Sequence, residues 1–327
     1  MERLNPLSDV VFSNIFRDMS AAPAMLSFIN AVLEAAGDGR IQQIIDMRSQ
    51  YTMIAELIGK KSGRVDVRAD AGDRQIFDTE VQLTAGLEMN ERDVFYTGKM
   101  LGDNLPEGAP YSQLPRVRVI NLLNYVIRRG SPVYLQPVDL MYRIPKPDGG
   151  MEVATDAIRI YHVQLPLFRE QHPTLESVKG DPLGLWLYAF DRGYRSEEEM
   201  EVLAAMTEGM GTFAKKYNLA LNDPRVRALY EYEMSAKMDE ATRLSNARTE
   251  GIGIGRAEGI GIGRAEGIGI GRAEGIGIGR AEGMENQAKL TALNMRRQLG
   301  IEDPDTVARL ISVEAGTVKR WFVENPK

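Results

Sequence analysis

Apolar and polar residues follow two different periods along the first two thirds of the chain. Three segments have apolar residues at every third or fourth position, a spacing that predicts helices over residues 8–19, 24–36 and 87–101. Four segments are rich in β-branched and aromatic residues and are bounded by Gly, Pro or Asp, which predicts strands over residues 64–69, 75–82, 116–126 and 157–165. The order of two helices, two strands, one helix and two strands predicts a mixed α/β core.

The sequence GIGIGRAE occurs four times in tandem from Gly251 to Glu282. Helical patterns precede it at residues 197–217 and 223–250, where Pro224 suits a helix start, and we interpret them as scaffold helices. Each repeat holds three Gly, and a helix loses on the order of 1 kcal/mol per Gly relative to Ala. Because an eight-residue period advances about 80° per repeat around a helix, the Ile side chains form no single stripe. We therefore interpret the repeat as a flexible spacer, with a helical connector as the alternative.

The chain contains no Cys and only two His, His162 and His172. The absence of Cys excludes a disulfide scaffold, a Cys-ligated zinc site and a cysteine nucleophile. Neither His stands in a metal-ligand spacing, and His162, inside a strand pattern, is expected to be a satisfied, half-buried histidine. Trp186 is expected in the core. Any catalysis is therefore expected to rest on carboxylates.

Charge is unevenly distributed along the chain. The net charge is -6, whereas the repeat is neutral and residues 284–327, with seven basic and six acidic residues, carry +1. The first 250 residues are therefore acidic, and such a domain repels phosphates unless its acids hold metal or lie away from the contact face. The N-terminus has no apolar core behind basic residues, and no segment approaches the roughly 18 apolar residues of a membrane span. We expect a cytoplasmic protein with no membrane partner.

Two neighbouring strands bring a pair of carboxylates together. Their connection at residues 70–73 has turn composition, so the strands are expected to pair as an antiparallel hairpin. Alternation then puts the Val and Phe side chains on one face and Asp66, Glu80 and Gln82 on the other. Such an oxygen-rich pocket suits a hard divalent cation such as Mg²⁺. From these residues alone, a pair of solvated acids is the alternative.

Asp66, followed fourteen positions later by Glu80-Val81-Gln82, resembles the core of PD-(D/E)XK nucleases. The chain as a whole resembles the Rpn family of recombination-promoting nucleases, also described as transposases. Further blocks carry the resemblance in order along residues 1 to 250: PLSDVVFSNIF, NERDVFYTGKML, LPRVRVINLLNY, IRIYHVQLPLF and DPLGLWLYAF. The glycine-containing tandem repeat is also typical of that family. The resemblance implies an α/β, restriction-endonuclease-like core with a helical C-terminal extension.

The same resemblance implies metal-dependent hydrolysis of DNA phosphodiesters. Its implied ligands for Mg²⁺, or another divalent cation such as Mn²⁺, are Asp66, Glu80 and the main-chain carbonyl of Val81. A metal there neutralises phosphate oxygens and lowers the pKa of a bound water. The third motif position, usually Lys, is Gln82 here. Gln cannot take a proton, although its amide can orient the attacking water, so the identity of the general base stays open.

Arg92, Tyr96 and Lys99 are spaced so that they share one face of a helix. If this face turns toward the site, these residues contact DNA phosphates; a solvated surface is the alternative. Asp9 opens the first helix, where an acid approaches the metal in some relatives. An interaction with the helix N-terminus behind Ser8 is its expected role.

The segment after the repeat predicts short helices joined by tight turns. One helix stops at Gly300, the next begins at Asp303, and Ser312 is expected to cap the last. With Lys319 and Arg320 exposed, the arrangement is similar to a helix-turn-helix DNA-binding unit. A small bundle that mediates self-association is the alternative, favoured by the net charge of only +1.

We expect four parts: a nuclease-like domain (residues 1–195), a helical extension (196–250), the repeat linker (251–283) and a helix-turn-helix-like piece (284–327). The leading hypothesis is a metal-dependent DNA endonuclease associated with DNA recombination or phage defence. The alternative is a catalytically decayed nuclease fold that acts as a DNA-binding or transposase-associated interaction protein. DNA is the expected partner, with a homo-oligomer and a short C-terminal product of the same gene as further candidates. Candidate internal starts for that product are Met234, Met238 and Met284.

Overall fold

The structure is a computed structural model of the chain. It describes residues 3–49, 66–84, 88–128, 130–143, 146–147 and 150–326, and at Asp66 it describes the backbone alone. The chain forms two compact units, residues 1–238 and 239–327. No helix among the described residues combines the length and the apolar character needed to span a membrane.

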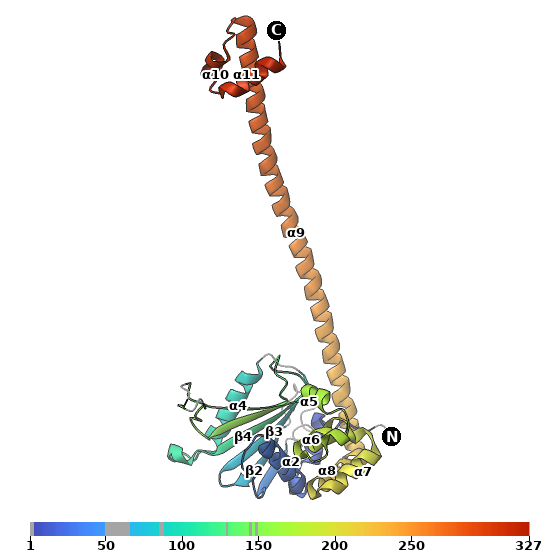
Figure 1. Cartoon of the computed structure of the whole chain (residues 1–327). Helices are drawn as coiled ribbons and strands as arrows, with labels where there is room; N and C mark the ends of the chain where they lie inside the picture. Colours follow the sequence, from blue (N-terminus) through green and yellow to red (C-terminus); the bar gives the residue numbers. More distant parts are fainter. Residues whose placement is uncertain are drawn as a thin grey trace. The chain divides into compact units, whose positions relative to one another are not determined.

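The described part of the first unit contains a mixed six-stranded sheet with strand order β1-β2-β3-β4-β6-β5 (Figure 1). Its strands are β1 (Asp46–Ser49), β2 (Asp66–Gly72), β3 (Gln75–Gln82), β4 (Arg116–Leu123), β5 (Leu135–Asp139) and β6 (Ile158–Gln164). β2 and β3 form the predicted antiparallel hairpin, β3, β4 and β6 run parallel, and β1 and β5 pair antiparallel at the two edges. The sequence predicts the four inner strands but misses both edge strands. Residues 64 and 65, the start of the first predicted strand, lie outside the described residues.

The β2–β3 hairpin turns at Asp73 and Arg74, not at residues 70–73 as predicted. Both residues adopt left-handed φ angles, 47° and 58°, the conformation that a tight two-residue hairpin turn requires. A register shift between Asp70 and Gly72 lengthens β2 into the expected turn.

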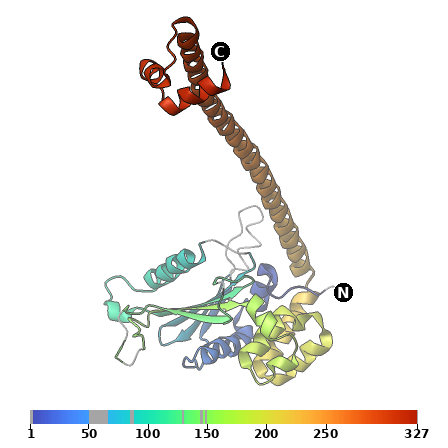
Figure 2. The same cartoon turned by 45° about the horizontal axis from the view of Figure 1, so that its top comes forward.

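The sheet has two different faces. The core face carries residues such as Val67 and Phe77, which join the main hydrophobic core with helix α2 (Ala22–Ala35). The opposite face, here called the α4 face, is covered by helix α4 (Met89–Asp103), whose apolar side chains pack on Val119 and its neighbours. Figures 1 and 2 show α2 and α4 on opposite sides of the sheet.

Other helices complete the core of the first unit. They are α1 (Asp9–Ile15), α5 (Leu165–Gln171), α6 (Pro182–Asp191), α7 (Glu197–Met206) and α8 (Glu208–Asn222). Trp186 is buried, as predicted, with its ring 5.8 Å from that of Phe28 and 5.5 Å from that of Phe213. Leu203 of α7 and Phe213 of α8 belong to this same core. The expected boundary at residue 195 therefore falls inside one compact unit.

The tandem repeat is helical, and its interpretation as a flexible spacer is wrong. Helix α9 runs without a break from Pro224 to Gln298. The repeats lie between segments that are themselves helical, and extending an existing helix is much easier than nucleating one. Arg, Ala and Glu in every repeat are strong helix formers, which offsets part of the Gly penalty. The Ile side chains of the repeats are exposed, in agreement with a period that forms no single stripe.

The second unit ends in helices α10 (Pro304–Ile311) and α11 (Ala315–Glu324). They pack with the end of α9 around a small core that contains Trp321 and Phe322. The short helices are as predicted, but Ser312 does not cap the start of α11. It adopts a left-handed φ of 56° and ends α10, because this conformation stops a helix.

Candidate active site

Four polar residues stand in register across the sheet. Asp66 of β2 pairs with Glu80 of β3, Glu80 with Asn121 of β4, and Asn121 with His162 of β6. We call these residues the polar row. Residues paired across a sheet share a face, so Glu80, Asn121 and His162 all lie on the α4 face. The side chain of Asp66 lies outside the described part of the structure.

Glu80 is the buried carboxylate of this row, with only 1% of its surface exposed. Its Oε2 atom lies 3.3 Å from Nε2 of Gln82 and 3.9 Å from Nη2 of Arg92. Arg92 also donates from Nη1 to Oε1 of Gln82 at 3.2 Å, and its guanidinium lies 5.9 Å from the ring centre of Tyr96. The structure therefore brings together two groups that the sequence selected separately, Glu80 with Gln82 and Arg92 with Tyr96.

The other predicted DNA-contacting residues lie elsewhere. Lys99 is exposed on α4, about two turns beyond Arg92. In the second unit, Lys319 pairs with Asp305 at 3.2 Å, with both side chains 56% exposed, and Arg320 is exposed. These three residues remain surface cations whose contact with DNA is a proposal.

A buried hydrogen-bond group beside Glu80 was missed by the sequence reasoning. Asp93 of α4 is 2% exposed, and its carboxylate accepts hydrogen bonds from Nδ2 of Asn121 at 3.0 Å and from Nε2 of His162 at 2.7 Å. His162 is satisfied, as predicted, but fully buried. The sequence does hold one sign of this group. Val117 and Val119 are buried on the α4 face of β4, and the next residue on that face is Asn121, a polar residue in a buried position that needs hydrogen-bond partners.

Asn121 keeps one polar atom unused. Its Oδ1 atom is buried and accepts no hydrogen bond from the described residues. A buried amide oxygen without a donor is unfavourable, so such atoms in proteins usually meet water, an ion or a ligand. This oxygen belongs to the residue paired with Glu80, which makes it a candidate to face a hydrated ion.

Asp9 takes part in a separate group at the start of α1. Ser8 caps the helix, as predicted, and Glu233 of α9 accepts the main-chain N–H of Asp9 at 3.1 Å. The Asp9 carboxylate lies 3.5 Å from Nζ of Lys237. Burial raises the pKa of Asp9 to about 6, although Lys237 opposes the shift, and the charge of Glu233 adds to it.

The donor set fits a hard divalent cation. Carboxylate, amide and main-chain oxygens are the ligands that Mg²⁺ and Mn²⁺ prefer. No three His, Asp or Glu side chains converge among those described, which do not include the Asp66 carboxylate. Among the described side chains of the polar row, Glu80 offers buried carboxylate oxygens and Asn121 offers an unused amide oxygen to such an ion.

A mixed α/β sheet whose polar row pairs Asp66 with a buried Glu80 is the arrangement of a nuclease-like domain. The chain matches the family described as PD-(D/E)XK nuclease family transposase over residues 6–247, and it belongs to that family. The fold expected from the sequence is thereby confirmed. The match includes the whole polar row, and nucleases of this type generally use divalent metal ions. No curated protein and no solved structure matches the chain.

Proposed function

We propose that the protein is a metal-dependent DNA endonuclease that hydrolyses phosphodiester bonds beside Glu80. The observation that carries the proposal is the buried carboxylate of Glu80, paired in the ladder with Asp66 and contacted by Gln82 and Arg92. A buried carboxylate is unfavourable unless a cation or several hydrogen bonds compensate it. A bound metal ion would compensate the buried charge of Glu80, so burial of this carboxylate favours binding of the metal that a nuclease needs.

Asp66, Glu80 and the main-chain carbonyl of Val81 would hold the cation, which we propose to be Mg²⁺ or Mn²⁺. When bound, such a cation supplies positive charge to the phosphate and lowers the pKa of a water molecule. Asn121 would offer its Oδ1 atom as an acceptor for a water near the ion.

The remaining side chains position the reacting groups. The amide of Gln82 is held between Glu80 and Arg92, and this support suits the proposed role of orienting a water molecule. Arg92, with 36% of its side chain exposed, would donate hydrogen bonds to a DNA phosphate at the edge of the site. Asp93 holds Asn121 through a hydrogen bond, and His162 in turn holds Asp93.

We further propose that DNA extends along α4 past Tyr96 toward Lys99, and that Lys319 and Arg320 make separate contacts. The family description names transposases, and cleavage of DNA strands is a step that recombination requires. DNA recombination or phage defence is accordingly the proposed cellular role. Retention of Asp66, Glu80 and Gln82 argues against a decayed nuclease fold.

Cleavage of supercoiled plasmid by the purified full-length protein tests this function. Nicked or linear products are expected with Mg²⁺ or Mn²⁺, and none with EDTA. Cleavage that persists in EDTA would contradict the role of the metal. A protein that cuts nothing in any divalent cation but shifts the same plasmid in a gel would be a DNA-binding protein on a decayed nuclease fold.

A further inference from the structure

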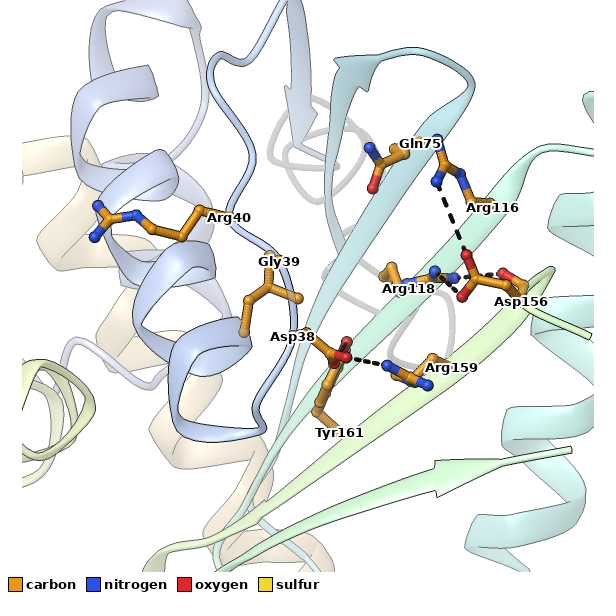
Figure 3. Close-up of a pocket in the computed structure, with 10 residues that line it drawn as sticks. Asp38, Gly39, Arg40, Gln75, Arg116, Arg118, Asp156, Arg159 and Tyr161 are labelled. Atoms are coloured by element: carbon orange, nitrogen blue, oxygen red, sulfur yellow. Dashed lines mark hydrogen bonds and ion pairs between the residues drawn. The ribbon is translucent and has the colours of Figure 1, made fainter. Parts of the chain in front are cut away.

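A second polar pocket lies at the opposite end of the parallel strands from the polar row. It is a cavity of about 250 Å³ between the amino ends of β3, β4 and β6 and the segment that follows α2 (Figure 3). Arg116 and Arg118 of β4, Gln75 of β3 and Asp156 line it. Its lining is mostly polar, so it is suited to a small charged group and not to an apolar ligand.

The pocket is separate from the candidate active site. Arg118 pairs with Phe77 in the ladder, so it lies on the core face, whereas Glu80 and Asn121 lie on the α4 face. The pocket also includes residues from the beginnings of the strands, and Glu80 is near the end of β3. A ligand in this pocket therefore has the thickness of the sheet between itself and the polar row.

Arg116 and Arg118 share one carboxylate. Figure 3 shows both guanidinium groups directed at Asp156. Arg118 Nη2 donates to Asp156 Oδ1 at 2.5 Å, and Arg116 Nη1 lies 3.8 Å from Asp156 Oδ2. Two positive charges thus face a single negative charge, and the Arg118 side chain is only 7% exposed.

Asp156 is the partner in this group that can move away most easily. Its side chain is 55% exposed, and it stands in an irregular segment just before β6. The main-chain carbonyl of Asp156 accepts a separate hydrogen bond from Arg118 Nη1 at 2.9 Å. The segment can therefore stay attached to Arg118 while the carboxylate gives up its place to another anion.

Arg159, a further arginine of the pocket, already pairs with two carboxylates, those of Asp38 and Asp139. Burial disfavours its charge, but hydrogen bonds to Asp139 and Asp38 outweigh burial and raise the pKa of Arg159. Its side chain is 18% exposed, and Asp38 also accepts a hydrogen bond from Tyr161 at 2.6 Å. Arg159, Asp38 and Tyr161 are therefore held by one another and line one side of the pocket.

We propose that the pocket binds a phosphate group, which replaces the Asp156 carboxylate between Arg116 and Arg118. Phosphate offers more acceptor oxygens than a carboxylate and matches the fork of two guanidinium groups. Gln75 also lines the pocket, and its amide can donate a further hydrogen bond to the phosphate. Either inorganic phosphate or the terminal phosphate of a DNA strand supplies this chemistry. The proposal does not depend on cleavage by the polar row.

Calorimetric titration of the full chain in EDTA, with inorganic phosphate as the probe, tests the proposal. Arg116→Gln, at a side chain that is 43% exposed, is expected to weaken binding about tenfold because it removes a charged donor. Asp156→Asn is expected to tighten binding by about tenfold because it removes the competing charge. Arg48→Gln is the matched control: this arginine is 80% exposed, pairs with Asp46 on β1, and does not line the pocket.

The source of the phosphate is identified with two oligonucleotide duplexes that differ only at the 5′ end. If the 5′-phosphorylated duplex binds more tightly than the 5′-hydroxyl duplex, and Arg116→Gln removes the difference, the ligand is a DNA end. If the two duplexes bind equally, while Arg116→Gln and Asp156→Asn still change the affinity for inorganic phosphate as expected, the ligand is free phosphate. The proposal is overturned if the wild type does not bind phosphate, or if Arg116→Gln and Asp156→Asn bind it as the wild type does.

Discussion

His162 Nε2 lies 2.7 Å from Asp93 Oδ2, and this contact joins strand β6 to the helix that covers it. Both side chains are almost fully buried, and Asn121 donates to the other oxygen of the same carboxylate. The group holds α4 at a fixed height above the sheet. Because Arg92 precedes Asp93 on α4, the same contact sets where Arg92 meets Glu80 and Gln82.

Removal of the Asp93 carboxylate is expected to destabilise the first unit. Asp93→Ala leaves the donors of Asn121 and His162 buried without a partner, which costs about 3 kcal/mol in the free energy of unfolding. Asp103→Ala, at an exposed position of the same helix, is expected to change that free energy by less than about 0.5 kcal/mol. Both changes are measured by urea unfolding, with Trp186 fluorescence as the signal and Trp321→Phe as the background variant. If Asp93→Ala and Asp103→Ala lower the free energy of unfolding equally, Asp93 does not fix α4.

Arg92 and Lys99 are expected to contribute unequally to cleavage. Arg92→Gln removes a guanidinium that contacts Glu80 and Gln82, so the initial rate of plasmid nicking is expected to fall about tenfold or more. Lys99→Gln removes an exposed charge and is expected to lower the rate by less than about threefold. A larger loss in Lys99→Gln than in Arg92→Gln would place the main phosphate contact farther along α4.

Asp9 is expected to make stability depend on pH. Its pKa rises from 3.8 to about 6 on folding, so the folded state binds the Asp9 proton more tightly than the unfolded state. Stability from this group is therefore present at low pH and is lost as the pH rises from about 4 to about 6. Asp9→Asn removes the charge and is expected to raise the Tm at pH 8 by about 2–4 °C, with little change at pH 4.

Asp18→Asn is the control of opposite sign for this pH experiment. A hydrogen bond from Ser20 lowers the pKa of Asp18, and although burial opposes the shift, contacts from Arg17 and Lys216 add to the lowering. Asp18→Asn is therefore expected not to raise the Tm at pH 8. If Asp9→Asn lowers the Tm at pH 8, the ion pair with Lys237 outweighs the burial of Asp9, and the stated sign is wrong.

Glycines inside the repeat are expected to limit the stability of α9. Gly261→Ala and Gly263→Ala have open space around the new methyl group, so each is expected to stabilise the helix by about 1 kcal/mol. Hydrogen exchange of residues 251–282 should slow in these variants. Gly300→Ala is expected to act in the opposite direction, because Gly300 has a φ of +68° after the helix end. Exchange at random-coil rates in every variant would show that the repeat is not helical.

Local pattern was enough to predict the hairpin, because alternation in residues 75–82 assigns Glu80 to one face without any tertiary information. β1 has only four residues, too few for a clear alternation, and β5 contains Pro137, which disfavours an inner strand although an edge strand tolerates it. The Asp93–His162 contact joins residues 69 positions apart, so no local signal reveals it. The helical repeat was mispredicted because per-residue propensity ignores the helices on both sides of it.

The most direct test of the central claim compares two glutamates in plasmid cleavage with Mg²⁺. Glu80→Gln keeps the shape of the buried side chain but removes its charge, and it is expected to reduce the nicking rate by about 100-fold or more while far-ultraviolet circular dichroism is unchanged. Glu91→Gln, at an exposed position on α4, is expected to cut within about twofold of the wild type. If Glu80→Gln cuts as fast as Glu91→Gln, the carboxylate of Glu80 does not hold the catalytic metal and the polar row is not the active site.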